Sequence, residues 1–358
     1  MKIAYLLDTF PSPTETFIAR EIAALRRRGF EITIFAINAG EGAHEFILPT
    51  RWKKTIIGEV AYFQGAGANW AQSWKANFDH IHSGWASYLA LVALGASEES
   101  GVSWSFSGHA RDLFVDGAHW TQKLQSAQFA AVCTRAGQAF LQLQAPEFAD
   151  KILFAPHGLE LDKFQFQEST APRAKELKIL SVGRLVEKKG FDLLLGAVAY
   201  LRAEQYSVEL NIIGEGPQRV ALEQQCTRLN INDYVGLSGS LPHEAVLRAM
   251  READIFALPC RVARDGDRDG LPNVLLEAAA CGVPIVAAQA GAVGEFVSET
   301  IGWICAPDDA TDLAQTLMKV WREPDETLRR SRKAREKVER DFDIETNIEV
   351  LARAFGGE

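Results

Sequence analysis

The chain has 358 residues, of which 47% are hydrophobic and 24% are charged, values that are ordinary for a globular protein. This composition excludes collagen-like, low-complexity and disordered chains, and the length predicts two domains, each large enough to bury its own core. The net charge of −9 argues against a nonspecific nucleic-acid binder, which needs surplus cations to neutralise phosphates.

The first 37 residues predict a strand, a helix and a second strand. The continuous apolar run Lys2–Leu7 is typical of a parallel strand that is covered on both faces. Ser12-Pro13-Thr14-Glu15 has the order of a capping box, so a helix is expected to start there and to end before Gly29. Glu31–Ile37 is β-branched and apolar and predicts the next strand, which completes a crossover unit.

The second half of the chain repeats this alternation. Strands and helices are predicted in turn over 178–182, 192–204, 209–213, 218–229, 235–237, 243–252, 255–258, 274–280 and 284–288. Regular alternation predicts a mostly parallel sheet with helices on both faces. The expected fold class is therefore α/β, with two doubly wound, Rossmann-like domains that face each other across a cleft.

The expected first domain covers residues 1–165 and the second covers 177–342, with the polar segment 165–176 as the linker between them. A last helix is predicted at about 343–356. Its apolar residues Ile344, Ile348, Leu351 and Phe355 follow helical spacing, so this helix is expected to pack back on the first domain.

The segment 269–295 carries the clearest chemical signal. A predicted helix opens there, and its free N–H groups favour a bound phosphate. Glu277 is the only charged residue between Asp269 and Glu295 and has Leu and Ala neighbours, so it is expected to be buried against a hydrogen-bonding partner such as a pair of sugar hydroxyls. The alternative is that Asp269 only stabilises the helix start and that Glu277 is solvated. The residues at the helix opening are Asp269, Gly270, Leu271, Pro272, Asn273 and Val274.

This segment resembles the nucleotide-sugar site of GT-B family 4 glycosyltransferases. The resemblance rests on an acid followed by Gly-Leu-Pro, seven residues between Asp269 and Glu277, the A-x-x-C-G-x-P run, and Gly291–Glu295. That family usually has Glu where this chain has Asp269, so an altered or water-mediated contact with the sugar is expected.

Two further segments of the second half are similar to the same family. In its members an Arg and a Lys spaced like Arg184 and Lys189 clamp the donor diphosphate, although cations near a strand end are equally often solvated. Gly214 and Gly216 begin a dinucleotide fingerprint, but Arg219 replaces its third glycine, which excludes NAD. The segment instead resembles a G-x-G-P turn of the family. Gly183, Gly214 and Gly216 therefore join the expected donor-binding residues.

The first half resembles the colanic acid or exopolysaccharide subgroup in the segments 10–18, 79–82 and 105–112, as does the closing Phe342-Asp343. Family members hold a His like His109 beside the transferred sugar, and the alternative is a hydrogen-bonded loop histidine. His80 and His82 have the H-x-H spacing of metal ligands. No third ligand follows from the sequence, so a cleft or core role without metal is expected.

The resemblance implies a glycosyltransferase of the hexosyltransferase class that moves a sugar, with retention, from a UDP-, GDP- or ADP-sugar to a glycan or lipid-linked glycan in polysaccharide biosynthesis. No cofactor or metal is expected. Arg184, Lys189 and the backbone of 270–274 would hold the diphosphate. Glu277 would accept the ribose hydroxyls, Asp269 would orient the sugar and His109 would donate to a sugar hydroxyl. A non-catalytic sugar- or nucleotide-binding protein stays open, as does a nucleotide-sugar epimerase or phosphorylase of the same fold.

A cytoplasmic location is expected. Five scattered cysteines favour a reducing compartment, and the apolar run 3–7 is too short for a signal peptide. The basic segments 26–28 and 52–54 suggest peripheral contact with the inner membrane, where lipid-linked glycans would be presented. The alternative for the arginines at 26–28 is stabilisation of a helix C-terminus.

Overall fold

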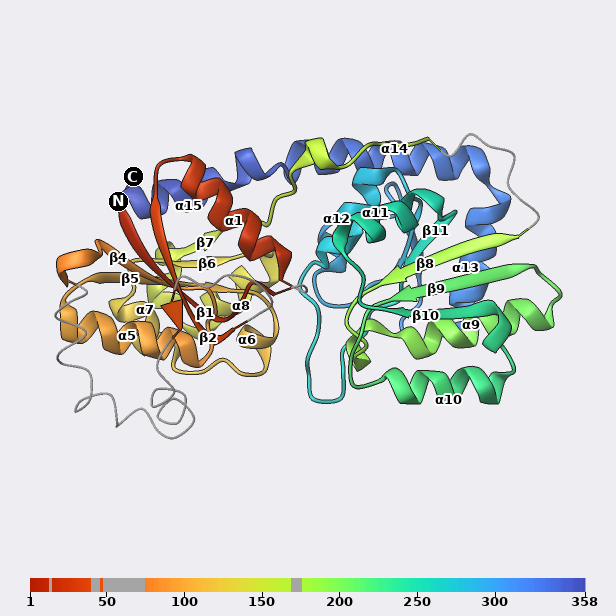
Figure 1. The fold of residues 1–358 in the computed structure, drawn as a ribbon, viewed down its shortest axis with the longest axis horizontal. Coiled ribbons are helices and arrows are strands. Elements are labelled where there is room, and N and C mark those ends of the chain that lie inside the picture. The colour runs from red at the N-terminus through yellow and green to blue at the C-terminus, as the bar shows by residue number, and fades with distance from the viewer. Residues whose placement is uncertain (13–14, 40–45, 48–74, 169–175, 358) are drawn as a thin grey trace. The chain divides into compact units, whose positions relative to one another are not determined.

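The computed structural model describes residues 1–12, 15–39, 46–47, 75–168 and 176–357 (Figure 1). The chain forms two compact units: unit 1 is Met1–Gly158 with Ile344–Glu358, and unit 2 is Leu159–Asp343. Each unit has a parallel sheet with helices, so the predicted α/β class with two Rossmann-like units is confirmed. None of the described helices is both long and apolar enough to cross a membrane.

The described part of unit 1 has a sheet of seven strands in the order β3-β2-β1-β4-β5-β6-β7, and the pairs are parallel. Strand β1 lies between β2 and β4 and buries the apolar run Ile3–Leu7, as expected for a strand covered on both faces. The strands are β1 (Lys2–Phe10), β2 (Glu31–Ala39), β3 (Phe46–Ile47), β4 (His80–Ser83), β5 (Ser103–Gly108), β6 (Ala130–Val132) and β7 (Ile152–Phe154).

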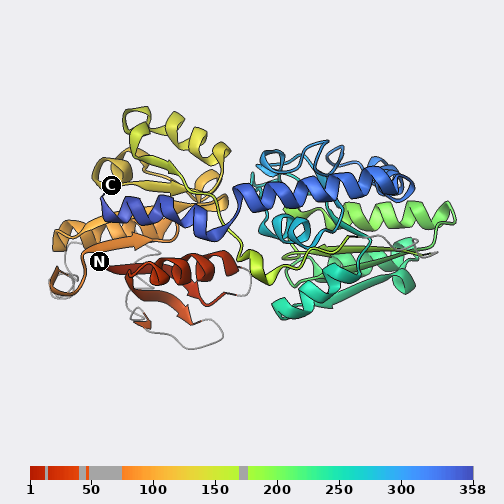
Figure 2. The same cartoon turned by 90° about the horizontal axis from the view of Figure 1, so that it is seen from above.

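Helices cover both faces of this sheet. Helices α1 and α15 lie side by side over one face (Figure 2). The apolar core of the other face includes residues of α5, α7 and α8. The described helices of unit 1 are α1 (Thr16–Arg27), α5 (Tyr88–Ser100), α6 (Arg111–Phe114), α7 (Trp120–Ser126), α8 (Arg135–Gln144) and α15 (Ile344–Gly356).

Helix α15 is held to α1 by apolar packing and by ion pairs. The predicted apolar residues Ile344, Ile348, Leu351 and Phe355 are all buried. Arg28 pairs with Glu345 at 2.8 Å and with Glu349 at 2.7 Å, and Arg27 pairs with Glu345 at 2.6 Å. Two of the arginines considered for a membrane surface are therefore engaged within unit 1. The other basic segment, 52–54, lies outside the described residues.

The described part of unit 2 has a sheet of six parallel strands in the order β10-β9-β8-β11-β12-β13. The strands are β8 (Leu177–Val182), β9 (Val208–Ile213), β10 (Val235–Gly239), β11 (Ile255–Leu258), β12 (Ile285–Ala288) and β13 (Trp303–Cys305). The helices are α9 (Phe191–Ala203), α10 (Arg219–Leu229), α11 (His243–Glu252), α12 (Asn273–Cys281), α13 (Ala310–Arg322) and α14 (Pro324–Asp341).

The predicted start of the first helix is wrong. Strand β1 continues through Phe10, and the N–H of Glu15 donates to the carbonyl of Ser12 at 3.1 Å. Helix α1 begins only at Thr16, and Glu15 occupies the N-cap without a side-chain cap. Pro13 and Thr14 lie outside the described residues.

The chain passes from unit 1 to unit 2 at Gly158–Leu159, ahead of the polar segment 165–176 suggested as the linker. Leu159 and Phe164 are both buried in the core of unit 2, which explains why the passage lies upstream of them. Within the polar segment, residues 169–175 lie outside the described part of the chain.

Candidate functional site

The topology of unit 2 directs attention to two loops. Strand order reverses between β8 and β11, and in doubly wound sheets ligands bind beyond the carboxyl ends of strands at such a point. Gly183 and Arg184 directly follow β8, and the loop 259–272 follows β11 and leads into α12. The residues predicted for the diphosphate and for the sugar therefore lie on the two loops that leave this switch point.

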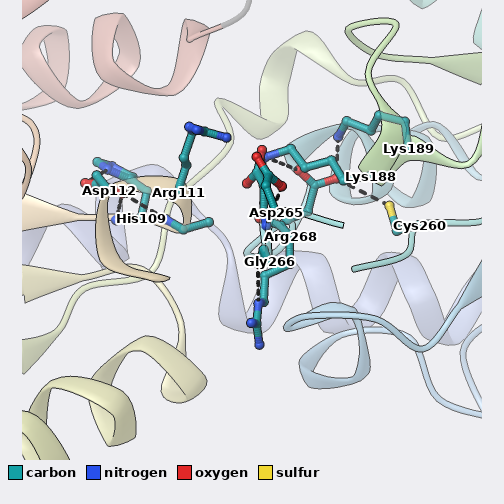
Figure 3. A network of polar contacts seen from close by, with 12 residues as sticks. His109, Arg111, Asp112, Lys188, Lys189, Cys260, Asp265, Gly266 and Arg268 are labelled. Carbon is teal, nitrogen blue, oxygen red and sulfur yellow. Dashed lines mark hydrogen bonds and ion pairs between the residues drawn. The ribbon is translucent and has the colours of Figure 1, made fainter. Parts of the chain in front are cut away.

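A buried ion pair joins these loops. Lys189 Nζ lies 2.6 Å from Asp269 Oδ2, and Lys188 Nζ lies 3.4 Å from Oδ1 of the same carboxylate (Figure 3). Burial alone would raise the pKa of Asp269, but the charges of Lys189 and Lys188 hold that pKa below its usual value. The Cys260 thiol donates to Asp269 Oδ2 at 3.4 Å, and burial raises the thiol's own pKa. Asp269 is therefore an ionised carboxylate with three partners.

Arg184 is the exposed cation of the loop after β8. Its side chain makes no hydrogen bond or ion pair with another residue of the described chain, and its charge acts on the nearby Lys189. Burial would lower the pKa of Lys189, but Asp269 raises it above the usual value, so Lys189 is cationic at neutral pH. The predicted Arg and Lys thus differ in environment, since one is exposed and the other is paired.

The glycines at 214 and 216 bring the loops after β8 and β9 into backbone contact. Gly214 has φ of 147°, and a Cβ there would lie 1.9 Å from the carbonyl oxygen of Gly183. Gly216 has φ of 158°, and its Cβ would lie 2.6 Å from the carbonyl oxygen of Leu185. Gly214 and Gly216 therefore pack against the backbone on either side of Arg184. This packing explains why both positions are glycines, without any contact between them and a ligand.

The start of α12 lies beside this cluster. The helix begins at Asn273, with Pro272 as an N-cap that has no side-chain acceptor for the first N–H groups. Gly291, at φ of +59°, packs so closely that a Cβ would lie 2.0 Å from the carbonyl oxygen of Asp269. Glu295 lies in the adjoining short 3-10 helix Val293–Glu295. The loops after β11 and β12 therefore meet at Asp269.

Glu277 is 6% exposed within α12, as its apolar sequence neighbours predicted. His243 Nε2, from the first residue of α11, lies 3.8 Å from Glu277 Oε2. The sequence did not identify His243, because 33 residues lie between it and Glu277 in the chain and the motif of segment 269–295 includes no histidine.

His109 follows β5 in unit 1 and is held by a buried aspartate that the sequence reasoning passed over. Asp112 Oδ1 accepts the backbone N–H groups of His109 and Ala110, and Oδ2 accepts that of Ala86, each at 3.0 Å. His109 Nδ1 lies 3.6 Å from Asp112 Oδ2. Burial would raise the pKa of Asp112, but its bonds to His109 and to the backbone lower it. The H-x-x-D spacing of His109 and Asp112 is the sequence pattern from which this contact could have been predicted.

A buried lysine completes this network. Lys123 is 1% exposed, and its ammonium donates to the carbonyl of Ala86 at 2.5 Å. Burial lowers the pKa of Lys123 to about 8, an effect that the charge of Asp112 opposes. Asp112 and Lys123 together fix the loops that follow β4 and β5, and hence the backbone of His109.

The imidazole of His109 lies among aromatic rings. Its centroid is 4.7 Å from that of Trp85, 5.0 Å from Phe17 and 5.2 Å from His157. A pocket of unit 1 next to Phe17 and His157 is also lined by Glu21, which accepts a hydrogen bond from Tyr5 at 2.5 Å. The His109 side chain is only 13% exposed, and it packs against Phe17 and His157, two residues that line this pocket.

His80 and His82 form a buried ladder with serines of β5. His80 bonds through its two ring nitrogens to Ser103 and Ser105, and His82 bonds to Ser105 and Ser107, at distances from 2.7 to 3.0 Å. Burial lowers the pKa of His80 to about 4 and lowers that of His82 well below its usual value. The serines occupy the nitrogens that a metal would need. Among the described residues, no cluster of three metal-ligating side chains is present.

Residues 162–337 match the family model described as Glycosyl transferases group 1. WcaL of Escherichia coli (strain K12), named as a colanic acid biosynthesis glycosyltransferase, is 26% identical over 410 residues, covering 99% of this chain and 98% of WcaL. The amylovoran biosynthesis glycosyltransferase AmsK of Erwinia amylovora is 35% identical over 205 residues, covering 57% of this chain and 50% of AmsK.

Solved structures show the same fold. The crystal structure of Anabaena Alr3699/HepE in complex with UDP-glucose has a TM-score of 0.78 and 20% identity, with 100% of both chains covered. The lipopolysaccharide outer core galactosyltransferase WaaB has a TM-score of 0.71 and 16% identity, covering 100% of this chain and 99% of that one. The two-unit architecture is therefore that of GT-B glycosyltransferases.

Proposed function

We propose that this chain transfers a sugar from a nucleoside diphosphate sugar to a glycan acceptor in exopolysaccharide biosynthesis. The match of residues 162–337 to the glycosyl transferases group 1 model and the GT-B fold support a glycosyltransferase. WcaL and AmsK, by their names, act in the biosynthesis of such polysaccharides, and HepE was crystallised with UDP-glucose. A UDP-sugar is thus the first donor to test.

The observation that carries the proposal is the charge arrangement at the switch point of unit 2. Arg184 is exposed and Lys189 is buried beside Asp269, on the loop after β8. Breaking the bond to the sugar places negative charge on the departing diphosphate, and fixed cations lower that barrier. In this proposal Arg184 and Lys189 bind the diphosphate, while the N–H groups at the start of α12 add further positive potential.

The two acids have separate roles in this proposal. Asp269 is ionised and lies against Lys189, so it orients the sugar next to the diphosphate. Glu277 lies about one turn inside α12 and is buried, which suits a carboxylate that accepts hydroxyls of the ribose. His109, whose backbone Asp112 fixes, donates to a hydroxyl of the transferred sugar. Retention of anomeric configuration, the cytoplasmic location and peripheral membrane contact remain predictions.

Thermal unfolding with UDP, GDP, ADP and their sugars identifies the donor base, because a ligand that binds only the folded chain raises the melting temperature. Release of nucleoside diphosphate in the presence of a glycan acceptor then demonstrates transfer, and the anomeric proton of the product reports its configuration. Binding without release would indicate a non-catalytic binding protein. Conversion of the donor sugar without transfer would indicate an epimerase, and phosphate-dependent release of sugar phosphate would indicate a phosphorylase.

A further inference from the structure

Lys188 is a buried lysine to which neither the sequence motifs nor the proposed function assign a role. The residue is 8% exposed, and its ammonium lies 3.0 Å from Asp267 Oδ1 and 3.4 Å from the carbonyl oxygen of Arg268. The same ammonium lies 3.4 Å from Asp269 Oδ1. Lys188 therefore ties three consecutive residues of the β11–α12 loop to the segment that follows β8 (Figure 3).

The adjacent lysine is in a different position. Lys189 has the closer contact with Asp269, at 2.6 Å, but in the proposed function it also binds the donor diphosphate. Phosphate oxygens are strong acceptors for ammonium groups, so a bound diphosphate competes with Asp269 for the N–H donors of Lys189. Lys188 does not take part in this exchange, because Asp267, whose side chain is 9% exposed, pairs with its ammonium inside the loop.

Asp269 needs a cation that stays in place throughout this exchange. A buried carboxylate that loses its charged partner is strongly destabilised in the ionised form. The titratable groups that act on Asp269 are Lys189, Lys188 and Cys260, and burial raises the pKa of the Cys260 thiol so that it acts as a neutral donor. When the diphosphate takes up Lys189, Lys188 is the cation that remains beside Asp269.

We propose that Lys188 is a positioning residue of the donor site: held by Asp267, it keeps the Asp269 carboxylate ionised and oriented toward the sugar while Lys189 binds the diphosphate. This inference rests on the proposed function and adds the residue that stabilises Asp269 in the donor complex. Lys188 itself contacts neither sugar nor phosphate in this arrangement.

The pKa of Asp269 in the presence of UDP tests this role. The protein is labelled with carbon-13 at the Asp carboxyls, and the Asp269 signal is assigned by its loss in Asp269→Asn. In the wild type we expect a pKa below the usual range with and without UDP. In Lys188→Met we expect UDP to raise it by about one unit or more, whereas Lys188→Arg, which keeps the charge, restores the low value. A pKa that UDP leaves equally low in Lys188→Met overturns the proposal.

Kinetics provide a second reading. In Lys188→Met the acid limb of the kcat profile is expected to move to higher pH, with kcat at pH 7 about tenfold lower or more and the donor KM nearly unchanged. The matched control is Lys333→Met, which removes an exposed lysine of α14. A loss confined to KM, or a Lys188→Arg variant no better than Lys188→Met, overturns the positioning role.

Asp267→Asn provides a second route if Lys188→Met does not fold. It releases the anchor of Lys188 and is expected to move the Asp269 pKa in the same direction. A wild-type chain that neither binds UDP nor turns over any nucleotide-sugar contradicts the proposed function itself. If the wild type binds UDP and turns over a nucleotide-sugar, but Lys188→Met and Asp267→Asn leave the Asp269 pKa unchanged, only this inference is contradicted.

Discussion

Each unit holds a largely enclosed aspartate in a segment that follows a strand of its sheet, Asp112 in unit 1 and Asp269 in unit 2, and the two are held in different ways. In unit 1, Asp112 accepts three backbone N–H groups from the loops after β4 and β5. In unit 2, Asp269 is held by the ammonium groups of two lysine side chains. Backbone donors cannot turn away, whereas lysine side chains can exchange one anion for another. The first arrangement suits a fixed loop, and the second suits a site that receives a charged ligand.

The largest effect is expected from Asp269→Asn. The variant keeps the shape of the side chain but loses the charge that orients the donor, so kcat should fall by about 100-fold or more. Steady-state release of nucleoside diphosphate measures this. Asp112→Asn serves as the comparison from unit 1. A kcat for Asp269→Asn within threefold of the wild type would remove Asp269 from the proposed mechanism.

Asp112→Ala should act chiefly on stability. It leaves three backbone N–H groups without their acceptor and removes the negative charge that acts on the buried Lys123 ammonium, so a loss of about 3 kcal/mol in the free energy of unfolding is expected. Calorimetric melting of the whole chain measures the loss, with the exposed Asp116→Ala as the control. Equal melting temperatures for the two variants would show that Asp112 does not fix these loops.

The histidine ladder should make unit 1 sensitive to acid. Burial lowers the pKa of His80 to about 4 from an unfolded value near 6.5, so the unfolded chain binds more protons across this interval. Stability is therefore fully present above about pH 6.5 and is lost as the pH falls toward 4, by about 1 kcal/mol for His80 between pH 7 and pH 5.5. Melting curves over that range, with His80→Asn as the comparison, check the slope. If His80→Asn loses stability with falling pH as steeply as the wild type, the acid sensitivity does not come from His80.

Arg184→Ala is expected to act on donor affinity alone. The side chain is exposed and pairs with no other described residue, so its removal should leave the melting temperature unchanged. UDP affinity should fall about tenfold, since one charge-assisted contact is lost. Isothermal titration measures the affinity, and Arg264→Ala, another exposed arginine of unit 2, is the control. An unchanged affinity would mean that the diphosphate does not contact Arg184.

The sequence predicted the elements that apolar runs or helical spacing mark, but not the helices α13 and α14, of 13 and 18 residues. The helix His243–Glu252 and the strand Ile255–Leu258 have the predicted bounds. Strand β13, with three residues, was not predicted because so short a run has little periodicity. The start of α1 was misplaced because a capping box describes local preference, and the continuation of β1 through Phe10 overrode it.

Some features of the site could also be predicted from the sequence, and others could not. Glu277 was recognised as buried from its neighbours alone. The pairing of Lys188 with Asp267 was not recognised, because the two lie 79 positions apart in the chain and only the sheet topology brings their loops together. Asp112 and Lys123 escaped notice for a related reason, since a buried charge is indistinguishable from a surface charge until its partners are known.

Hydrogen exchange with and without UDP tests most directly whether the exchangeable lysine–aspartate cluster of unit 2 is the donor site. The expected result is slower exchange in the segments 183–190 and 266–276 when UDP is bound, with no change in unit 1 at the loop 108–113. At a UDP concentration near the wild-type Kd, most of that protection is expected to be lost in Arg184→Ala and Lys189→Met. Protection confined to unit 1, or protection in unit 2 that both variants retain, would contradict the assignment of the nucleotide to Arg184, Lys189 and Asp269.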